Sequence, residues 1–189
     1  MKRASMLLAL TLVACEKQEP VSHVPREEAV NIAREAAQAA FQQLSAELAK
    51  TIEDGGTEAA IPVCSTKAQT LVSDVAATRK LTMIRLSDRP RNPKQAAGVE
   101  DLAAMENFRA AMKQGEAPSP AVQEMADGST VVRLPIILSQ PLCLQCHGSA
   151  DEIAPQTRSA ILATYPEDKA TGYQINDLRG IWRIDVSTP

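Results

Sequence analysis

The feature that most constrains this chain is the run Cys143-Leu144-Gln145-Cys146-His147, a C-x-x-C-H motif. This spacing is typical of c-type haem attachment, because each thiol can add across a porphyrin vinyl group while the histidine binds the iron. The alternatives are a redox dithiol and half of a zinc site. The sequence shows no βαβ context for a dithiol, and only two histidines from which zinc could draw ligands. We therefore predict haem c, attached through Cys143 and Cys146, with His147 as an axial iron ligand.

The N-terminus is typical of an export signal. A basic start, Met1-Lys2-Arg3, precedes an apolar run that is too short to span a bilayer and ends at Cys15. Leu12-Val13-Ala14-Cys15 is similar to a bacterial lipobox, in which cleavage leaves Cys15 as a lipid-bearing N-terminus; the alternative is an ordinary signal peptide with Cys15 a free thiol. We expect residues 1–14 to be removed and the protein to be exported and lipid-anchored to a membrane on its periplasmic side, where C-x-x-C-H motifs also acquire haem.

Length and charge limit the remaining options. After a polar tether over residues 15–24, residues 25–189 suffice for one domain with a full core and are too few to predict two. The formal net charge of −3 becomes more negative once Lys2 and Arg3 are removed. A mildly acidic chain with 3% aromatic residues offers no electrostatic basis for nucleic-acid partners or for an anionic membrane surface. Any membrane attachment would come from the lipid.

Cys64 is the cysteine that neither lipid nor haem accounts for. It falls on a helical apolar stripe with Ile61, Ala68, Leu71 and Val75. The proline at Pro62 predicts a helix start there, which would place Cys64 near free N–H groups that favour a thiolate. Cys64 is therefore either a buried core residue or the second axial ligand. Competing ligands are Met83, Met105, Met112, Met125 and, less favoured because it lies in the tether, His23.

Periodicity predicts both helices and strands. A long amphipathic helix opens after Pro25, carries a stripe that includes Ala33, Ala37 and Phe41, and ends at Gly55-Gly56. Further helices are expected over residues 57–75, 99–112 and 154–163, and strands over residues 81–87, 130–138 and 178–186. Pro135 predicts an edge position or a bulge for its strand. The stiff loop around Arg91 is either a solvated turn or a clamp for haem propionates.

Several stretches together resemble the Tll-like haem-domain family. They are Cys64 within residues 60–64, Arg85-x-Ser87-x-x-x-Arg91-Asn92-Pro93, the C-x-x-C-H motif, Tyr165-Pro166-x-Asp168-x-Ala170-x-Gly172-Tyr173 and Asp177-Leu178-Arg179-Gly180. The resemblance runs from Pro25 to the C-terminus. It implies a PAS-like α+β fold, a small antiparallel sheet flanked by helices with one c-type haem, and axial ligation by His147 and Cys64. It also marks Arg91, Asn92, Tyr165, Tyr173 and Arg179 as candidate propionate or pocket residues.

Histidine and thiolate ligation would have consequences for function. An anionic sulfur ligand stabilises ferric iron and so predicts a low reduction potential, and two strong ligands leave no open site for peroxidase or oxygenase chemistry. We expect a membrane-anchored electron carrier with an unidentified redox partner protein, and not an enzyme. The alternative is a redox or gas sensor that exchanges its thiolate for a diatomic gas. The sequence shows no transmembrane helix, kinase or cyclase that would report a signal, which favours electron transfer.

Overall fold

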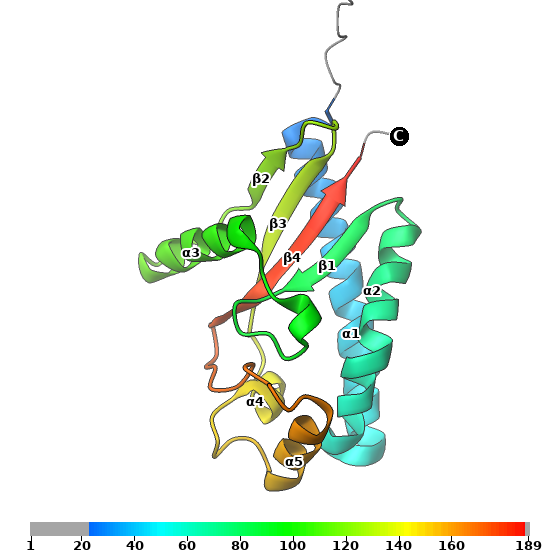
Figure 1. Cartoon of the computed structure of the whole chain (residues 1–189), viewed down its shortest axis with the longest axis vertical. Helices are drawn as coiled ribbons and strands as arrows, with labels where there is room; N and C mark the ends of the chain where they lie inside the picture. Colours follow the sequence, from blue (N-terminus) through cyan, green and yellow to red (C-terminus); the bar gives the residue numbers. More distant parts are fainter. Residues whose placement is uncertain (1–22, 188–189) are drawn as a thin grey trace, which may run out of the picture.

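The computed structural model describes residues 23–187 as an α+β fold around one antiparallel sheet in the order β1-β4-β3-β2 (Figure 1). Helices α1 and α2 cover one face of the sheet, α3 crosses the other, and α4 and α5 lie beyond one end. The elements are α1 (Arg26–Pro62), the π-helical turn η1 (Val63–Lys67), α2 (Ala68–Ala77), β1 (Thr82–Leu86), the 3-10 turn η2 (Pro93–Gln95), α3 (Val99–Lys113), β2 (Ala121–Glu124), β3 (Thr130–Ile137), α4 (Pro141–His147), α5 (Pro155–Thr164) and β4 (Leu178–Val186). The expected leader and Cys15 lie outside the described residues.

The central strand β4 divides the core by its alternation. Trp182, Ile184 and Val186 share one face, as predicted, and pack in the cluster formed with α1 and α2. Ile181 faces the other way, against Phe108 of α3. Because successive side chains of a strand point to opposite faces, this nine-residue strand supplies both halves of the core.

Helices α1 and α2 form a hairpin that turns near the end of the sheet (Figure 1). The predicted break at Gly55-Gly56 is confirmed, since Gly56 has φ 76° and ψ −179° within α1, a conformation that favours glycine. The packed side of α1 consists of small alanines such as Ala33, Ala36 and Ala40. Phe41 was expected on this stripe but is 46% exposed, because it follows Ala40 and is turned about 100° away around the helix.

Pro135 was predicted to lie in an edge strand or at a bulge. The edge-strand alternative is wrong, because β3 is an inner strand of the sheet. Strand β2, which the periodicity did not predict, pairs only as far as Ala121 opposite Arg133. Pro135 therefore lies where β3 has no β2 partner, one residue before a register shift between Ile136 and Ile137. The missing N–H of proline costs no ladder hydrogen bond on that side.

A buried ion pair fixes α3 to the sheet. Arg133 Nε of β3 donates to Asp101 Oδ1 of α3 at 2.6 Å, and both side chains are almost fully buried. Arg133 Nη1 also donates to Gln123 Oε1 of β2 at 3.0 Å. The pair thus joins β2, β3 and α3. None of the helices within residues 23–187 has the length and apolar character that a membrane span requires.

Gly180 marks the closest approach between β4 and β1. A Cβ at this position would lie 2.4 Å from the Leu86 carbonyl oxygen, which is backbone and cannot move aside. Gly180→Ala should therefore lower the free energy of unfolding by about 1–3 kcal/mol in urea titrations followed by circular dichroism. Gly98→Ala is the control, because its Cβ would meet only Asp101 Oδ2 at 3.6 Å. Equal stability of the two variants would contradict the prediction.

Candidate haem site

The predicted attachment motif and Cys64 come together at one end of the sheet. Cys143, Cys146 and His147 lie on α4, whereas Cys64 lies on η1, in the second arm of the helical hairpin after its turn at Gly56. Ile61, one turn before Cys64, is fully buried in a cluster against which Cys146 and Tyr165 pack. A hydrogen bond joins the hairpin to α5, between the hydroxyls of Thr57 and Thr157, whose Oγ1 atoms are 2.5 Å apart. The fold therefore places the start of the second hairpin arm beside α4 and α5.

A π-helical turn carries Cys64. Pro62 has no N–H to continue the α-helical ladder, and its carbonyl accepts the hydroxyls of Ser65 and Thr66 at 3.0 and 2.8 Å. The Ala68 N–H then donates to the Val63 carbonyl, five residues back. The helix start predicted at Pro62 is thus wrong, because α1 runs through Pro62 into η1 and offers Cys64 no free N-terminus. Single π turns occur frequently at functional sites.

Cys64 is not part of the packed core. Its side chain is exposed, whereas Ile61, Ala68 and Val75 of the predicted stripe are buried, since the widened turn rotates Cys64 off that stripe. Burial by the surrounding protein nevertheless raises the pKa of its thiol, and the positive charges of Arg85 and Arg91 act in the opposite direction. The thiol is thus open to solvent and lies near two arginines. This environment does not fit a core cysteine.

His147 is held in one orientation by the backbone. Its Nδ1 lies 2.7 Å from the Ala170 carbonyl oxygen, so the neutral ring carries its proton on Nδ1 and donates it there. Burial, reinforced by the positive charges of Arg179 and Arg91, holds the pKa of this imidazole well below its usual range. The ring is therefore neutral at neutral pH. Its Nε2 keeps a free lone pair, the form in which histidine binds metal.

The segment after α5 fixes the C-terminal end of α4. Tyr173 N–H donates to the His147 carbonyl at 2.9 Å, and Gly172 N–H donates to the Gly148 carbonyl at 2.6 Å. A Cβ at Gly148 would lie 2.6 Å from the Leu144 carbonyl, so the close turn out of α4 requires glycine. Residues from two distant parts of the chain thus define where the imidazole points.

Arg91 clamps the site. Its Nε and Nη2 donate to the two oxygens of Asp168 at 3.2 and 3.1 Å, and Nη2 also donates to the Cys146 carbonyl at 2.5 Å. The Nε and Nη2 groups of Arg91 are thus used within the protein, and the prediction that this residue also binds a propionate stays a prediction. Arg91 is 8% exposed and Asp168 2%. The pair joins the loop after β1, the end of α4 and the loop after α5.

The other predicted pocket residues divide into two groups. Asn92 accepts the Lys94 N–H at 3.0 Å and so caps η2, while Tyr165 packs beside Cys146. Tyr173 is buried, its ring lies edge-on to His147 at 6.3 Å, and its Oη has no hydrogen-bond partner within the described residues. Arg179 Nη1 donates to Ser87 Oγ at 2.9 Å, with the guanidinium 5.4 Å from the Tyr173 ring centre.

Two further arginines belong to the site and were not predicted. Arg85 of β1 has a buried Nε without a partner among residues 23–187, and its guanidinium lies 5.8 Å from the Trp182 ring centre. Arg89 stacks 4.2 Å from the Tyr173 ring centre and donates to the Thr171 carbonyl. The sequence carried a signal for Arg85, since strand alternation places its cationic side chain on the same face of β1 as the buried Met83.

These four arginines give the site a surplus of positive charge. Among the ion pairs within the described part of the chain, only Arg91 of the four is matched by a carboxylate, Asp168. Arg85, Arg89 and Arg179 are held by carbonyls, a hydroxyl and aromatic rings instead. Arg85, Arg89 and Arg179 are half-buried, and a partly desolvated surplus of positive charge of this kind is expected to favour an anion.

The competing ligands lie elsewhere. Met83 and Met105 are buried in the two core clusters that flank the sheet, and Met112 packs against the second of these clusters. His23 precedes α1, whose N-terminus is at the opposite end of the molecule from α4 (Figure 1). Within residues 23–187, no three His, Cys, Asp or Glu side chains gather to hold a metal ion.

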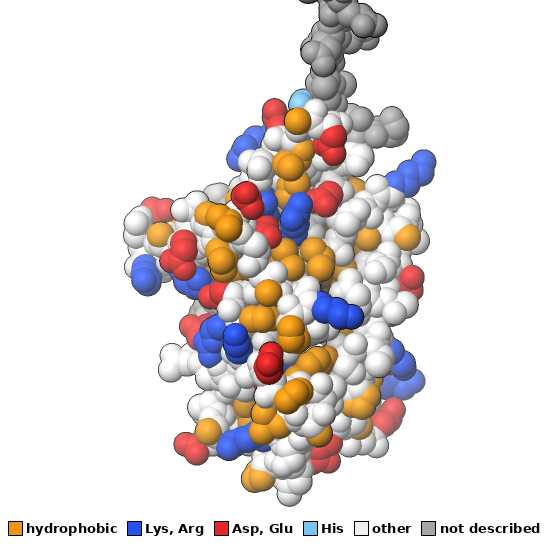
Figure 2. All heavy atoms as spheres, viewed as in Figure 1, with side chains coloured by type: hydrophobic (Ala, Val, Ile, Leu, Met, Phe, Trp, Pro, Cys, Tyr) orange, Lys and Arg blue, Asp and Glu red, His pale blue; other side chains and the backbone are white. Residues whose placement is uncertain are grey.

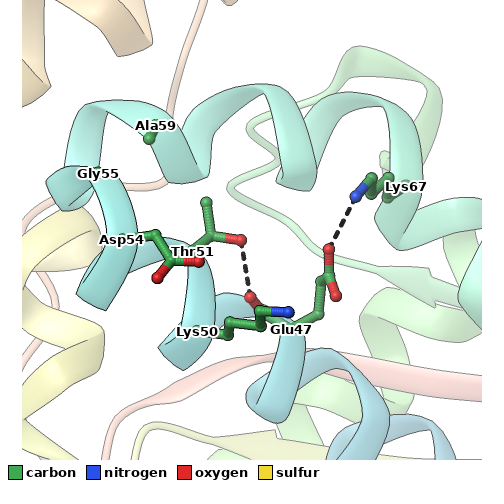
Figure 3. Close-up of a pocket in the computed structure, with 7 residues that line it drawn as sticks. All are labelled: Glu47, Lys50, Thr51, Asp54, Gly55, Ala59 and Lys67. Carbon is green, nitrogen blue, oxygen red and sulfur yellow. Dashed lines mark hydrogen bonds and ion pairs between the residues drawn. The ribbon is translucent and has the colours of Figure 1, made fainter.

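A separate hollow of about 390 Å³ lies in the bend of the hairpin (Figure 3). Its charges are satisfied locally, because Lys67 Nζ contacts Glu47 Oε1 at 2.9 Å and Thr51 Oγ1 donates to the Glu47 carbonyl at 2.8 Å. Lys50 and Asp54 complete a lining of mixed sign. This lining includes none of the α4 residues, and its mixed charges do not favour a ligand of one sign.

Sheet order, helix placement and the α4 site together define an α+β domain with one His- and Cys-bearing site at the end of its sheet. A family model described as Tll0287-like matches residues 25–187. The chain therefore belongs to the Tll0287-like family, in agreement with the resemblance drawn from its motifs.

A solved structure agrees with this assignment at the level of the fold. It is the crystal structure of the cyanobacterial heme-protein Tll0287, which is 22% identical to this chain with a TM-score of 0.61. The match covers 88% of this chain and 98% of that one. At this identity the match establishes the fold alone. No curated protein sequence matches the chain.

The Arg91 clamp generates a stability prediction. Arg91→Met leaves the buried Asp168 carboxylate without its partner and should lower the free energy of unfolding by about 3–5 kcal/mol in urea titrations. Adding Asp168→Asn should recover part of this loss. Arg109→Met is the control, because its pair with Asp88 is partly exposed and should cost at most about 1 kcal/mol. Equal losses in both single variants would contradict the clamp.

Proposed function

We propose that this protein binds one c-type haem at the α4 site and acts as an electron carrier. The observation that carries the proposal is the neutral His147 with a free Nε2, positioned within a C-x-x-C-H motif near half-buried arginines that have no carboxylate partner. The name of the related heme-protein supports the same cofactor. Cys143 and Cys146 would attach the porphyrin, and His147 would bind the iron.

The residues around α4 fit such a group. Haem carries two propionates, and the site offers Arg85 and Arg179 without carboxylate partners, together with the unsatisfied Tyr173 Oη. Each of these polar atoms is costly when buried alone and satisfied when it meets a carboxylate. Arg85, Arg179 and Tyr173 are therefore our assignment for propionate binding, with Arg91 holding α4 in place through Asp168.

Cys64 is our assignment for the second axial ligand. Two observations support it: its exposure away from the core and its position on a π turn beside α4. Burial raises the pKa of its thiol, and the positive charges of Arg85 and Arg91 act against that rise. Haem supplies reversible one-electron chemistry at its iron. A thiolate ligand favours the ferric state and hence a low reduction potential.

Export and membrane anchoring complete the proposal. A lipid on Cys15 would hold the domain on the periplasmic side of a membrane, where haem is attached to C-x-x-C-H motifs. On the face shown in Figure 2, Lys and Arg side chains are interspersed with Asp and Glu, which supports anchoring by lipid and not by charge. A redox partner protein would exchange electrons with the carrier, and a thiolate and an imidazole together would leave no open site for an enzyme reaction.

A PAS-like redox or gas sensor is the second candidate, and one contact favours it. Arg109 of α3 holds Asp88 at 2.5 Å, and Asp88 lies in the loop that carries Arg89 and Arg91. Through this ion pair, movement of the loop would shift α3, which packs on the face of the sheet opposite α1 and α2. In this function a diatomic gas would replace the Cys64 thiolate on reduced iron.

The first test is spectroscopic. Ferric protein produced with an intact c-type maturation system should give low-spin thiolate features in absorption and electron paramagnetic resonance spectra. Cys64→Ala should shift the iron to high spin, because the anionic sulfur ligand is lost. Ser65→Ala, on the same turn, should keep the parent spectrum. Unchanged thiolate features in Cys64→Ala would remove Cys64 from the iron, and a colourless exported protein would overturn the haem proposal itself.

The second test concerns Arg85. A buried positive charge favours the reduced iron, so Arg85→Gln should lower the reduction potential by on the order of tens of millivolts in a spectroelectrochemical titration. Lys94→Gln serves as control, because its exposed charge is screened by solvent. If both variants shift the potential equally, Arg85 does not act on the iron.

A further inference from the structure

A second, apolar groove lies between α1, the end of β3 and the proline-containing segment before β2, with a volume of about 390 Å³. Its helical wall consists of Arg34, Ala37, Gln38 and Phe41, which recur at the spacing of one helix face. A helix rises 1.5 Å per residue, so this wall is about 10 Å long. It has a guanidinium at one end and an aromatic ring at the other.

The fold explains why the groove exists. Strand β2 pairs with β3 only as far as Arg133, which leaves Ile136 and Ile137 half-buried beside α1. Pro135 has no N–H to offer an added strand, and the segment opposite is lined by prolines as well. A peptide strand would therefore find few backbone partners here, and a small apolar molecule fits the groove better.

The charge of the groove is equally specific. Arg34 is exposed and has no carboxylate within ion-pair distance among residues 23–187. It is the only charged residue in the described lining, where Phe41, Ile137 and Trp182 supply apolar surface. An anionic membrane surface would require several basic side chains on this wall. The single cation at the end of this apolar groove is complementary to a ligand with one negative charge.

We propose that this groove binds a single-chain amphiphile with a carboxylate head, of the medium-chain fatty-acid type. The carboxylate would meet the Arg34 guanidinium, and the alkyl chain would lie along Phe41 and Ile137. The groove volume falls within the usual range of small-molecule sites, towards its lower limit, which favours a short chain. This site is separate from the α4 site, although Trp182 lines the groove and also contacts Arg85.

Calorimetric titration of the purified protein with decanoate, below its micellar concentration, tests the proposal. Saturable binding at one site is expected. Arg34→Gln should weaken decanoate binding about tenfold or more while leaving the binding of decanol unchanged, because only the acid presents a charge to Arg34. Phe41→Ser should weaken both ligands. Phe41 is 46% exposed, so this variant should still fold, which circular dichroism verifies.

Arg26→Gln is the matched control, since Arg26 is an exposed arginine of the same helix outside the groove. It should bind decanoate like the parent protein. Absence of saturable decanoate binding would overturn the proposal, as would equal affinity in Arg34→Gln and the parent or an equal loss in Arg26→Gln. Because binding is measured directly, these outcomes are independent of whether the α4 site carries haem.

Discussion

The interaction on which the site most depends is the buried fork of Arg91. It ties the loop after β1 to Asp168 and to the carbonyl at the end of α4, three segments that are far apart in the sequence. Without this fork, the last turn of α4 would be held chiefly by the backbone bonds from Gly172 and Tyr173. The Ala170 carbonyl orients the His147 imidazole, and Arg91, which lies on none of the elements bearing the proposed haem ligands, holds the segments that carry both groups.

The sequence predicted those parts of the fold whose signals are local. The alternation of Trp182, Ile184 and Val186 predicted β4, and Gly55-Gly56 predicted the break in α1. It did not predict β2, because four residues without marked alternation become a strand only by pairing with β3. Phe41 was misplaced for a related reason: apolar spacing alone does not reveal that alanines form the side of α1 that packs closely on the sheet.

The site was predictable in its residue types but not in its contacts. The C-x-x-C-H spacing of Cys143, Cys146 and His147 is a local signal, so it predicts haem attachment without knowledge of the fold. The separate roles of the arginines could not be predicted in this way, because they depend on which guanidinium lies within reach of a carboxylate. Arg91 is matched by Asp168, whereas Arg85 is left without a partner, and only tertiary structure decides between them. The exposure of Cys64 was not predictable either, because it follows from a π turn, which apolar periodicity does not reveal.

The π turn at Cys64 has a mechanical consequence. A π turn departs from the regular i to i−4 hydrogen bonds of an α-helix, and this one lies within the hairpin arm that begins after the kink at Gly56. If Cys64 binds the iron as proposed, rewinding this turn into a regular α-helix would move its sulfur while α4 keeps its position. The proposed His147 ligand would thus stay in place, whereas the proposed Cys64 ligand could be released.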